Sequence, residues 1–284
     1  NMADHATTPQ WNNANHTIFI YTGGRAPQHI TRARIDKSVK VIDGEAFSNN
    51  PHLISVEIHD GVERVMIMAF CNCTSLRSVK LLGVKVIEEG AFYNCISLTD
   101  VKLGVKLETI GDDTFAHCSS LKQMTIPFAR TIGKQAFTNC TQLTDLALPE
   151  GLERVGLNAL KNCPSLKRIA MPLKDGMFVG KGALDCTNLS TLSLVGGIHH
   201  LVYSSPLEHW SNEMKDDIRS INKILPKTEE CEKNNAIQRW AEPLFFKIHH
   251  YKMEHYSYGI LKEADNLLER ALFIQSGGVR TRRR

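Results

Sequence analysis

The sequence of 284 residues has no long apolar run and no sign of a secretory signal. A membrane-spanning helix needs about 20 consecutive apolar residues, and no stretch approaches that length, so we expect no membrane span. The residues from Asn1 onward lack the basic and then apolar order of a signal peptide. Because the sequence begins at Asn1 and the first methionine is Met2, a missing upstream targeting segment stays open.

The short motifs of common enzymes are missing as well. There is no G-x-S-x-G, no phosphate-binding loop, and no G-x-G-x-x-G followed by a suitable acidic residue. No two histidines stand four residues apart, the helical spacing that brings two imidazoles together, and no C-x-x-C pair offers zinc ligands. We therefore expect no catalysis, no cofactor, no metal site and no small-molecule substrate.

The sequence also has little excess charge. Its formal charge of +4 comes from 34 basic and 30 acidic residues. The tail accounts for most of this excess, through Arg280, Arg282, Arg283 and Arg284. Four charges supply little affinity for phosphate, so a nucleic-acid partner is not expected. An apolar content of 42% is enough for a sizeable core and one or two domains.

What the sequence does contain is one block that recurs about seven times with a period of about 22 to 24 residues. An aromatic position occupies Phe47, Phe70, Phe92, Phe115 and Phe137, and then weakens to Leu160 and Leu184. A second position reads Asn50, Cys73, Cys95, Cys118, Cys140, Cys163 and Cys186. Three residues further on stand Leu53, Leu76, Leu98, Leu121, Leu143, Leu166 and Leu189. We expect both the aromatic and the cysteine columns to be structural.

A unit of this length makes one coil, which cannot bury its own apolar face and must stack on a neighbour. Each coil carries a pair of apolar residues with period two, such as Val101 and Leu103, which predicts a short strand with these side chains inward and Asp100 and Lys102 outward. Pro127 and Pro149 end their strands. The stacked coils therefore predict a solenoid with a parallel sheet.

The clearest blocks read VIEEGAFYNCISLTDVKL from Val86 and TIGKQAFTNCTQLTDLAL from Thr131. They resemble the BspA-type leucine-rich repeats, whose unit is I-G-x-x-A-F-x-x-C-x-x-L-x-x-V-x-L-P, over residues 30 to 200 or so. The resemblance implies an α/β solenoid, a leucine-rich-repeat horseshoe used for binding and without chemistry. Departures lie at the ends, where Leu160 and Leu184 replace phenylalanine and Asn50 replaces cysteine.

The flanks differ from the repeat. Ser205 and Pro206 are typical of a helix start, and Leu207, Trp210, Met214, Ile218, Ile221 and Leu225 form an apolar stripe that Pro226 ends. A second helix is expected from Glu229 to Ala241 and a longer third one from Pro243. The predicted domains are a disordered segment 1–16, a solenoid 17–204, a helical cap or hairpin 205–276, and a basic tail 277–284. The helices either cover the last coil or bind a partner.

The repeated cysteines are expected to be buried, reduced thiols. Neighbouring coils lie about 4.8 Å apart, which is close enough for a disulfide, but equivalent side chains point in parallel rather than at one another. Buried thiols then act as small hydrophobic groups. A ladder of reduced thiols favours a cytoplasmic or other intracellular location, with the cell surface as the alternative if an upstream signal is missing.

The outward residues of the sheet are the candidate partner-binding surface, and the alternative for them is a merely solvated face. Nine of them form the predicted site: Glu57, Lys80, Asp100, Lys102, Gln123, Thr125, Asp145, Arg168 and Thr191. The earlier coils present charged side chains and the later ones small side chains. The sequence therefore predicts a protein-interaction scaffold with an unknown protein partner. The alternative is a cell-surface or secreted adhesion or recognition protein.

Overall fold

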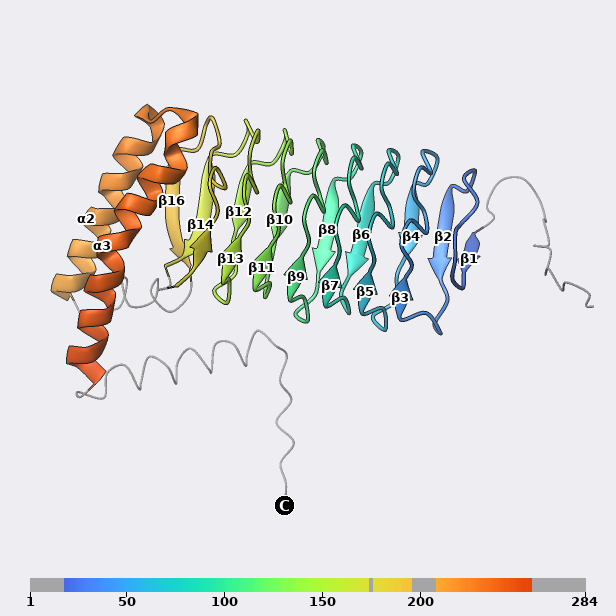
Figure 1. Ribbon diagram of the computed structural model, residues 1–284, viewed down its shortest axis with the longest axis horizontal. Helices are drawn as coiled ribbons and strands as arrows, with labels where there is room; N and C mark the ends of the chain where they lie inside the picture. The colour runs from blue at the N-terminus through green and yellow to red at the C-terminus, as the bar shows by residue number, and fades with distance from the viewer. Residues whose placement is uncertain (1–17, 174–175, 196–207, 257–284) are drawn as a thin grey trace, which may run out of the picture.

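A computed structural model describes residues 18–173, 176–195 and 208–256 (Figure 1). Within these ranges the coils follow one another along one axis, and two helices stand at the C-terminal end of the stack. The predicted α/β solenoid with parallel strands and a C-terminal helical segment is confirmed. The segments 1–16 and 277–284 and the predicted boundary at residue 204 lie outside the described residues.

The front of the solenoid carries one strand from each coil, and all of these strands pair in parallel. The first sheet contains β1 (Phe19–Tyr21), β2 (Arg32–Ile35), β4 (Ser55–Glu57), β6 (Ser78–Leu81) and β8 (Asp100–Leu103). The second contains β10 (Gln123–Thr125), β12 (Asp145–Ala147), β14 (Arg168–Pro172) and β16 (Thr191–Val195). Strands β8 and β10 are neighbours but belong to different sheets, so the front consists of two sheets rather than the single predicted one.

A third sheet, which the sequence pattern did not predict, runs along the back of the solenoid. Its seven short strands are β3 (Val41–Ile42), β5 (Arg64–Val65), β7 (Val86–Ile87), β9 (Thr109–Ile110), β11 (Thr131–Ile132), β13 (Arg154–Val155) and β15 (Phe178–Val179). Each of these strands has two residues, which is too few to show the alternation by which a strand is predicted. They are strands because the neighbouring coils pair with them.

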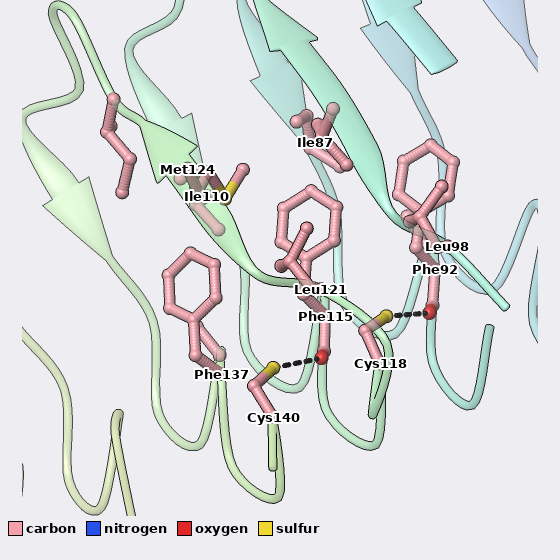
Figure 2. Close-up of a cluster of buried hydrophobic side chains, with 14 of the residues drawn as sticks. Ile87, Phe92, Leu98, Ile110, Phe115, Cys118, Leu121, Met124, Phe137 and Cys140 are labelled. Atoms are coloured by element: carbon pink, nitrogen blue, oxygen red, sulfur yellow. Dashed lines mark hydrogen bonds between the residues drawn. The ribbon is translucent and has the colours of Figure 1, made fainter. Parts of the chain in front are cut away.

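The aromatic column forms a continuous stack in the interior (Figure 2). Successive rings from Phe47 to Phe137 lie 4.9, 5.1, 5.4 and 5.5 Å apart between centroids, with interplanar angles of 4° to 13°. Tyr21 begins the stack, 5.0 Å from Phe47, and its hydroxyl donates a hydrogen bond to Asp43. The column thus holds one coil at a fixed spacing from the next.

The cysteine column makes a specific bond that its apolar character did not predict. Each thiol donates to the backbone carbonyl at the aromatic position of the preceding coil, as Cys118 does to Phe92 and Cys140 does to Phe115, both at 3.2 Å (Figure 2). The same bond joins Cys73 to Phe47, Cys95 to Phe70, Cys163 to Phe137 and Cys186 to Leu160. All six thiols are free and buried. In the first coil Asn50 replaces cysteine, and its amide donates to the Pro27 carbonyl at 2.7 Å.

The turn before each cysteine uses the left-handed backbone region, which explains why asparagine recurs there. Positive φ values between 56° and 63° occur at Asn49, Asn72, Asn94, His117, Asn139 and Asn162. Asparagine tolerates this region better than most residues do. Its amide also links the coils, because Asn72 donates to Asn49 at 2.8 Å and Asn94 donates to Asn72 at 2.9 Å.

The C-terminal helices are α2 (Glu208–Ile224) and α3 (Glu230–Tyr256), joined by the 3-10 turn η2 (Leu225–Lys227). The prediction of a break before Pro243 is wrong, since α3 continues through this residue. Proline removes one helical hydrogen bond, but Ala241 and Leu244 on either side are buried against Met214 and Leu194. Packing of this kind is what stabilises most helices in proteins, and here it keeps the helix continuous.

Polar side chains of the helices make the bonds that a further coil would make. The Gln238 amide donates to the Val179 carbonyl at 2.9 Å, as the backbone of Gly180 does to Val155 one coil earlier. The Asn222 side chain bonds both the N–H and the carbonyl of Leu192 in the last front strand, β16, at 2.7 and 3.0 Å. The described helices therefore lie against the last coil and occupy its exposed backbone groups.

Candidate interaction surface on the front of the solenoid

The front strands place the nine predicted partner-binding residues in two parallel columns. Together these columns make up the front face, defined as the outward side chains of β2, β4, β6, β8, β10, β12, β14 and β16. The first column is Arg32, Ser55, Ser78, Asp100, Gln123, Asp145, Arg168 and Thr191. The second is Arg34, Glu57, Lys80, Lys102, Thr125, Ala147, Ala170 and Ser193. All nine predicted residues belong to this face, and of these only Asp145 and Thr191 are half-buried.

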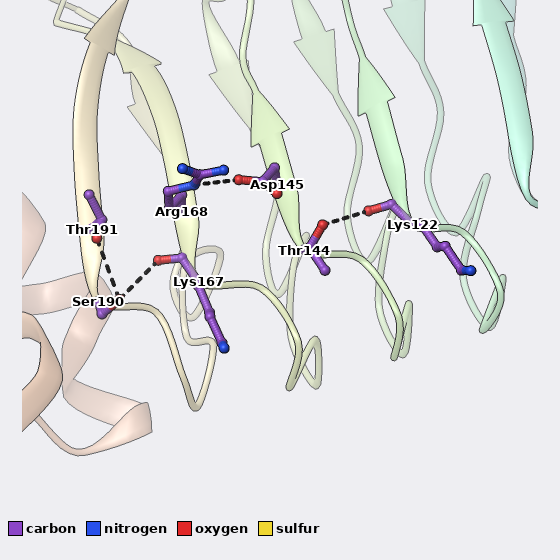
Figure 3. Close-up of polar contacts among 7 residues, drawn as sticks. All are labelled: Lys122, Thr144, Asp145, Lys167, Arg168, Ser190 and Thr191. Atoms are coloured by element: carbon purple, nitrogen blue, oxygen red, sulfur yellow. Dashed lines mark hydrogen bonds and ion pairs between the residues drawn. The ribbon is translucent and has the colours of Figure 1, made fainter.

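Part of the charge on the front face is already neutralised within it. Arg168 donates to Asp145 at 2.5 Å (Figure 3), and Arg34 donates to Glu57 at 2.5 Å. These hydrogen bonds hold the pKa of both carboxyl groups below its usual range. Three of the predicted contact residues therefore already form salt bridges within the chain, which reduces the charge that they offer to a partner. Arg34 was not predicted, because its segment looked like a partial opening coil.

Two lysines at the centre of the front face form no such salt bridge within the described residues. Lys80 and Lys102 are paired in register on β6 and β8, and both side chains are exposed. Adjacent like charges repel each other across paired strands. Neither lysine forms a salt bridge with any residue in the described part of the chain. An anionic partner would relieve this repulsion.

A further column, immediately before the front strands, alternates between basic and hydroxyl residues. From the coil that contains β6 onward, this front edge column consists of Arg77, Thr99, Lys122, Thr144, Lys167 and Ser190, whereas Thr31 and Ile54 hold the same position in the coils of β2 and β4 and do not follow the alternation. Each hydroxyl donates to the backbone carbonyl of the preceding basic residue, at 3.1 Å for Thr99, 3.2 Å for Thr144 and 3.3 Å for Ser190. Figure 3 shows the bonds of Thr144 and Ser190. The hydroxyl residues therefore stabilise, through these hydrogen bonds, the backbone that carries the basic side chains.

Arg77, Lys122 and Lys167 were not among the predicted site residues, although a pattern for them exists. These three residues recur every 45 residues, which is two coils, whereas the predicted columns repeat in every coil. All three side chains are exposed, and none forms a salt bridge with another residue of the described ranges. The column therefore presents three unneutralised positive charges on one side of the solenoid.

The back edge shows the opposite arrangement with the same two-coil period. This back edge column consists of Lys40, Glu63, Lys85, Glu108, Arg130 and Glu153, whose charges alternate in sign. Each backbone N–H after the first donates to the preceding carbonyl at 2.8 Å, so the side chains stand in one row. Lys85 lies 2.9 Å from Glu63 and Arg130 lies 3.3 Å from Glu153, and the hydrogen bond from Lys85 lowers the pKa of Glu63. Two of the three basic residues of the back edge column are therefore paired with a glutamate of the same column.

Few groups among the described residues are arranged to bind a metal ion or to act as a nucleophile. Within residues 18–173, 176–195 and 208–256 no three His, Cys, Asp or Glu side chains are grouped to hold a metal ion. Burial raises the pKa of the column thiols, to about 12 for Cys118 and for Cys163, so they are almost entirely protonated near neutral pH. Neither described helix is long and apolar enough to cross a membrane.

The stacked coils, with their leucine, aromatic and cysteine columns, define a leucine-rich-repeat solenoid. The sequence matches the family described as BspA type leucine rich repeat region, in six copies over residues 40–129 and 108–205. These matches cover more than half of the chain, and the chain belongs to this family. The resemblance found in the sequence is confirmed. Solenoids of this family are generally not catalytic.

Several solved structures are similar to this one. A leucine-rich repeat protein from T. pallidum is 32% identical, with a TM-score of 0.41 over 46% of this chain and 63% of that chain. A leucine-rich repeat protein from Eubacterium ventriosum is 25% identical, with a TM-score of 0.47 over 52% of this chain and 41% of that chain. A leucine rich cell surface protein from Faecalibacterium prausnitzii is 17% identical, with a TM-score of 0.27 over 57% of this chain and 59% of that chain. The chain thus spans less than two thirds of each of these proteins. No match was found among curated proteins.

Proposed function

We propose that this protein is a non-catalytic interaction scaffold that binds a protein partner through its front face. The observation that carries the proposal is the contrast in charge between the two sides of the solenoid. The back edge column pairs two of its three basic residues internally, whereas Lys80 and Lys102 stand exposed and in register on the front without a salt bridge in the described part of the chain. Rigid parallel strands hold the outward side chains in a fixed array, which lowers the entropy lost on binding.

The proposed location is intracellular, and the alternative is a cell-surface or secreted recognition protein that uses the same face. The six thiols of the cysteine column support the first, since each donates to a carbonyl and none is in a disulfide. The N-x-Ser/Thr triplets at Asn72 and Asn139 do not favour the second, because both amides are bonded within the asparagine column. Fractionation of the source cells, with glycosidase treatment of the recovered protein, separates the two locations.

The test is a comparison of two charge-matched variants of the full chain. K80Q/K102Q removes two positive charges from the front face, and K85Q/R130Q removes two from the back edge column. Proteins captured by the unaltered chain are identified, purified and titrated against all three forms. The proposal expects a loss of affinity of about ten-fold for K80Q/K102Q and little change for K85Q/R130Q, because two desolvated charge contacts contribute this much. Equal affinity of all three forms for every purified partner contradicts it.

A further inference from the structure

From Arg77 to Ser190 the front edge column repeats every two coils, and stacking explains its hydroxyl residues, which bond the preceding carbonyl, but not its basic residues. The interior columns repeat in every coil, as the six thiol bonds and the stacked rings show. The basic residues at every second coil therefore indicate an interaction with a molecule outside the solenoid. On the back edge column two of the three basic residues form salt bridges with glutamates of the same column. On the front edge column the basic side chains have no such acid among the described residues.

The geometry of the column sets the spacing of a matching ligand. Parallel strands lie about 4.8 Å apart, so basic residues two coils apart are separated by about 10 Å along the solenoid axis. Figure 3 shows Lys122 and Lys167 extending in a similar direction from the sheet edge, on either side of the coil that contains Thr144. The backbone continues from Lys122 through Thr144 to Lys167 by hydrogen bonds of 2.9 and 3.2 Å. Arg77 lies on the other side of the junction of β8 and β10, across which the described backbone shows no hydrogen bond in this row.

Among regular polypeptide structures, an α-helix fits this spacing. Residues seven apart in a helix lie about 10.5 Å apart on nearly the same side, because seven residues make almost two turns. In an extended strand, three residues span about 10 Å, but the odd number places alternate side chains on opposite faces. Over two steps the helix exceeds the column by about 2 Å, which long arginine and lysine side chains accommodate.

We propose that the front edge column binds an acidic helix of a partner protein, which lies along the solenoid axis with carboxylates at every seventh residue facing Arg77, Lys122 and Lys167. The inference rests on the proposed function and names the chemistry of the partner. Three positions further along the later strands stand Thr125, Ala147, Ala170 and Ser193, whose small side chains leave room for a helix beyond the first column of the front face.

A nucleic acid fits the same surface poorly. Duplex DNA carries a charge for about every 1.7 Å of its axis, whereas this column offers a cation for about every 10 Å. The front face keeps its own acids, with Asp100 exposed and Glu57 and Asp145 paired to arginine, and these repel a uniform polyanion. Neither the front face nor the front edge column contains an aromatic side chain on which a base can stack.

The experiment measures the affinity of the full chain for two labelled, alanine-rich peptides of 18 or so residues. Both contain three glutamates, in one at every seventh position and in the other at positions that face different sides of the helix. The R77Q/K122Q/K167Q variant removes the front cations, and K40Q/K85Q/R130Q removes the same number from the back edge column. Thermal unfolding verifies that each variant is folded.

We expect the peptide with seven-residue spacing to bind about ten-fold more tightly than the scrambled one, since three exposed charge pairs contribute about this factor. R77Q/K122Q/K167Q should abolish the preference and K40Q/K85Q/R130Q should leave it unchanged. Equal affinity for both peptides, or equal loss in both variants, overturns the proposal. Tighter binding of an oligonucleotide that R77Q/K122Q/K167Q abolishes assigns the column to nucleic acid instead. If neither peptide binds while a captured partner still depends on Lys80 and Lys102, this inference fails and the proposed function stands.

Discussion

The interior and the exterior of this solenoid repeat with different periods. Inside, the ring of Phe92 and the thiol of Cys118 have equivalents one coil away, and the same bond joins each pair of coils. Outside, Lys122 has its equivalent two coils away, with Thr144 between them. The interior period follows from stacking, since each coil must present the same surface to both neighbours. The doubled exterior period points to a different requirement, which is pairing within the back edge column and, by our proposal, a partner at the front.

The largest expected effect comes from breaking the interior period. Phe115→Ala removes one ring from a stack in which both neighbouring rings lie within 5.5 Å. The resulting cavity should lower the free energy of unfolding by about 3–5 kcal/mol. Urea denaturation measures the change. Phe128→Ala is the control, because the Phe128 side chain is exposed, and a loss as small as that of the control contradicts the structural role of the column.

A substitution at the end of the solenoid that the helices cover should lower the free energy of unfolding by less than Phe115→Ala does. Lys233 is buried, and its ammonium group donates to the carbonyls of Thr187 and Leu189 at 2.6 and 2.8 Å. Lys233→Met keeps the length of the side chain but leaves both carbonyls without this donor, which should cost about 1–3 kcal/mol. Hydrogen exchange should accelerate in β16 and not in β6. Acceleration of equal size in both strands would show a global effect rather than a loss of the cap.

The buried thiol column should make the free energy of unfolding depend on pH in the alkaline range. Burial raises the pKa of Cys118 from 9.0 to about 12, so the folded state keeps a proton that the unfolded state loses. Stability is therefore fully present below pH 9 and falls between pH 9 and 12, by about 1.4 kcal/mol per pH unit for this thiol. Urea denaturation across this range should give a shallower slope for Cys118→Ala than for the unaltered chain. Identical slopes would exclude the contribution of Cys118.

The smallest effect is expected for the exterior. Glu153→Gln removes the partner of Arg130 on the back edge column, where both side chains are more than half exposed. Such a surface pair contributes about 0–1 kcal/mol, and high salt should remove the difference from the unaltered chain. A loss as large as that of Phe115→Ala would mean that the exterior period is also a stacking requirement, and the comparison of the two periods would fail.

Much of the fold is predictable from the repeat, because each coil repeats the same strongly patterned residues. The front strands, the aromatic column and the end of the first helix near Pro226 follow directly from spacing and turn residues. The back sheet does not, since two residues such as Thr131 and Ile132 carry no detectable alternation. The continuity of α3 through Pro243 depends on burial of Leu244 against distant residues, which local preferences do not include.

The candidate surface divides in the same way. The order of amino acids alone specifies which residues point outward, because side chains alternate along a strand and coils repeat. It does not specify that Arg168 neutralises Asp145, that Thr144 fastens the carbonyl of Lys122, or that Lys80 lies beside Lys102. These contacts join residues about 22 positions apart, and only stacking brings them within hydrogen-bonding distance. The tertiary structure therefore decides which of the outward charges remain without a salt bridge and are available to a partner.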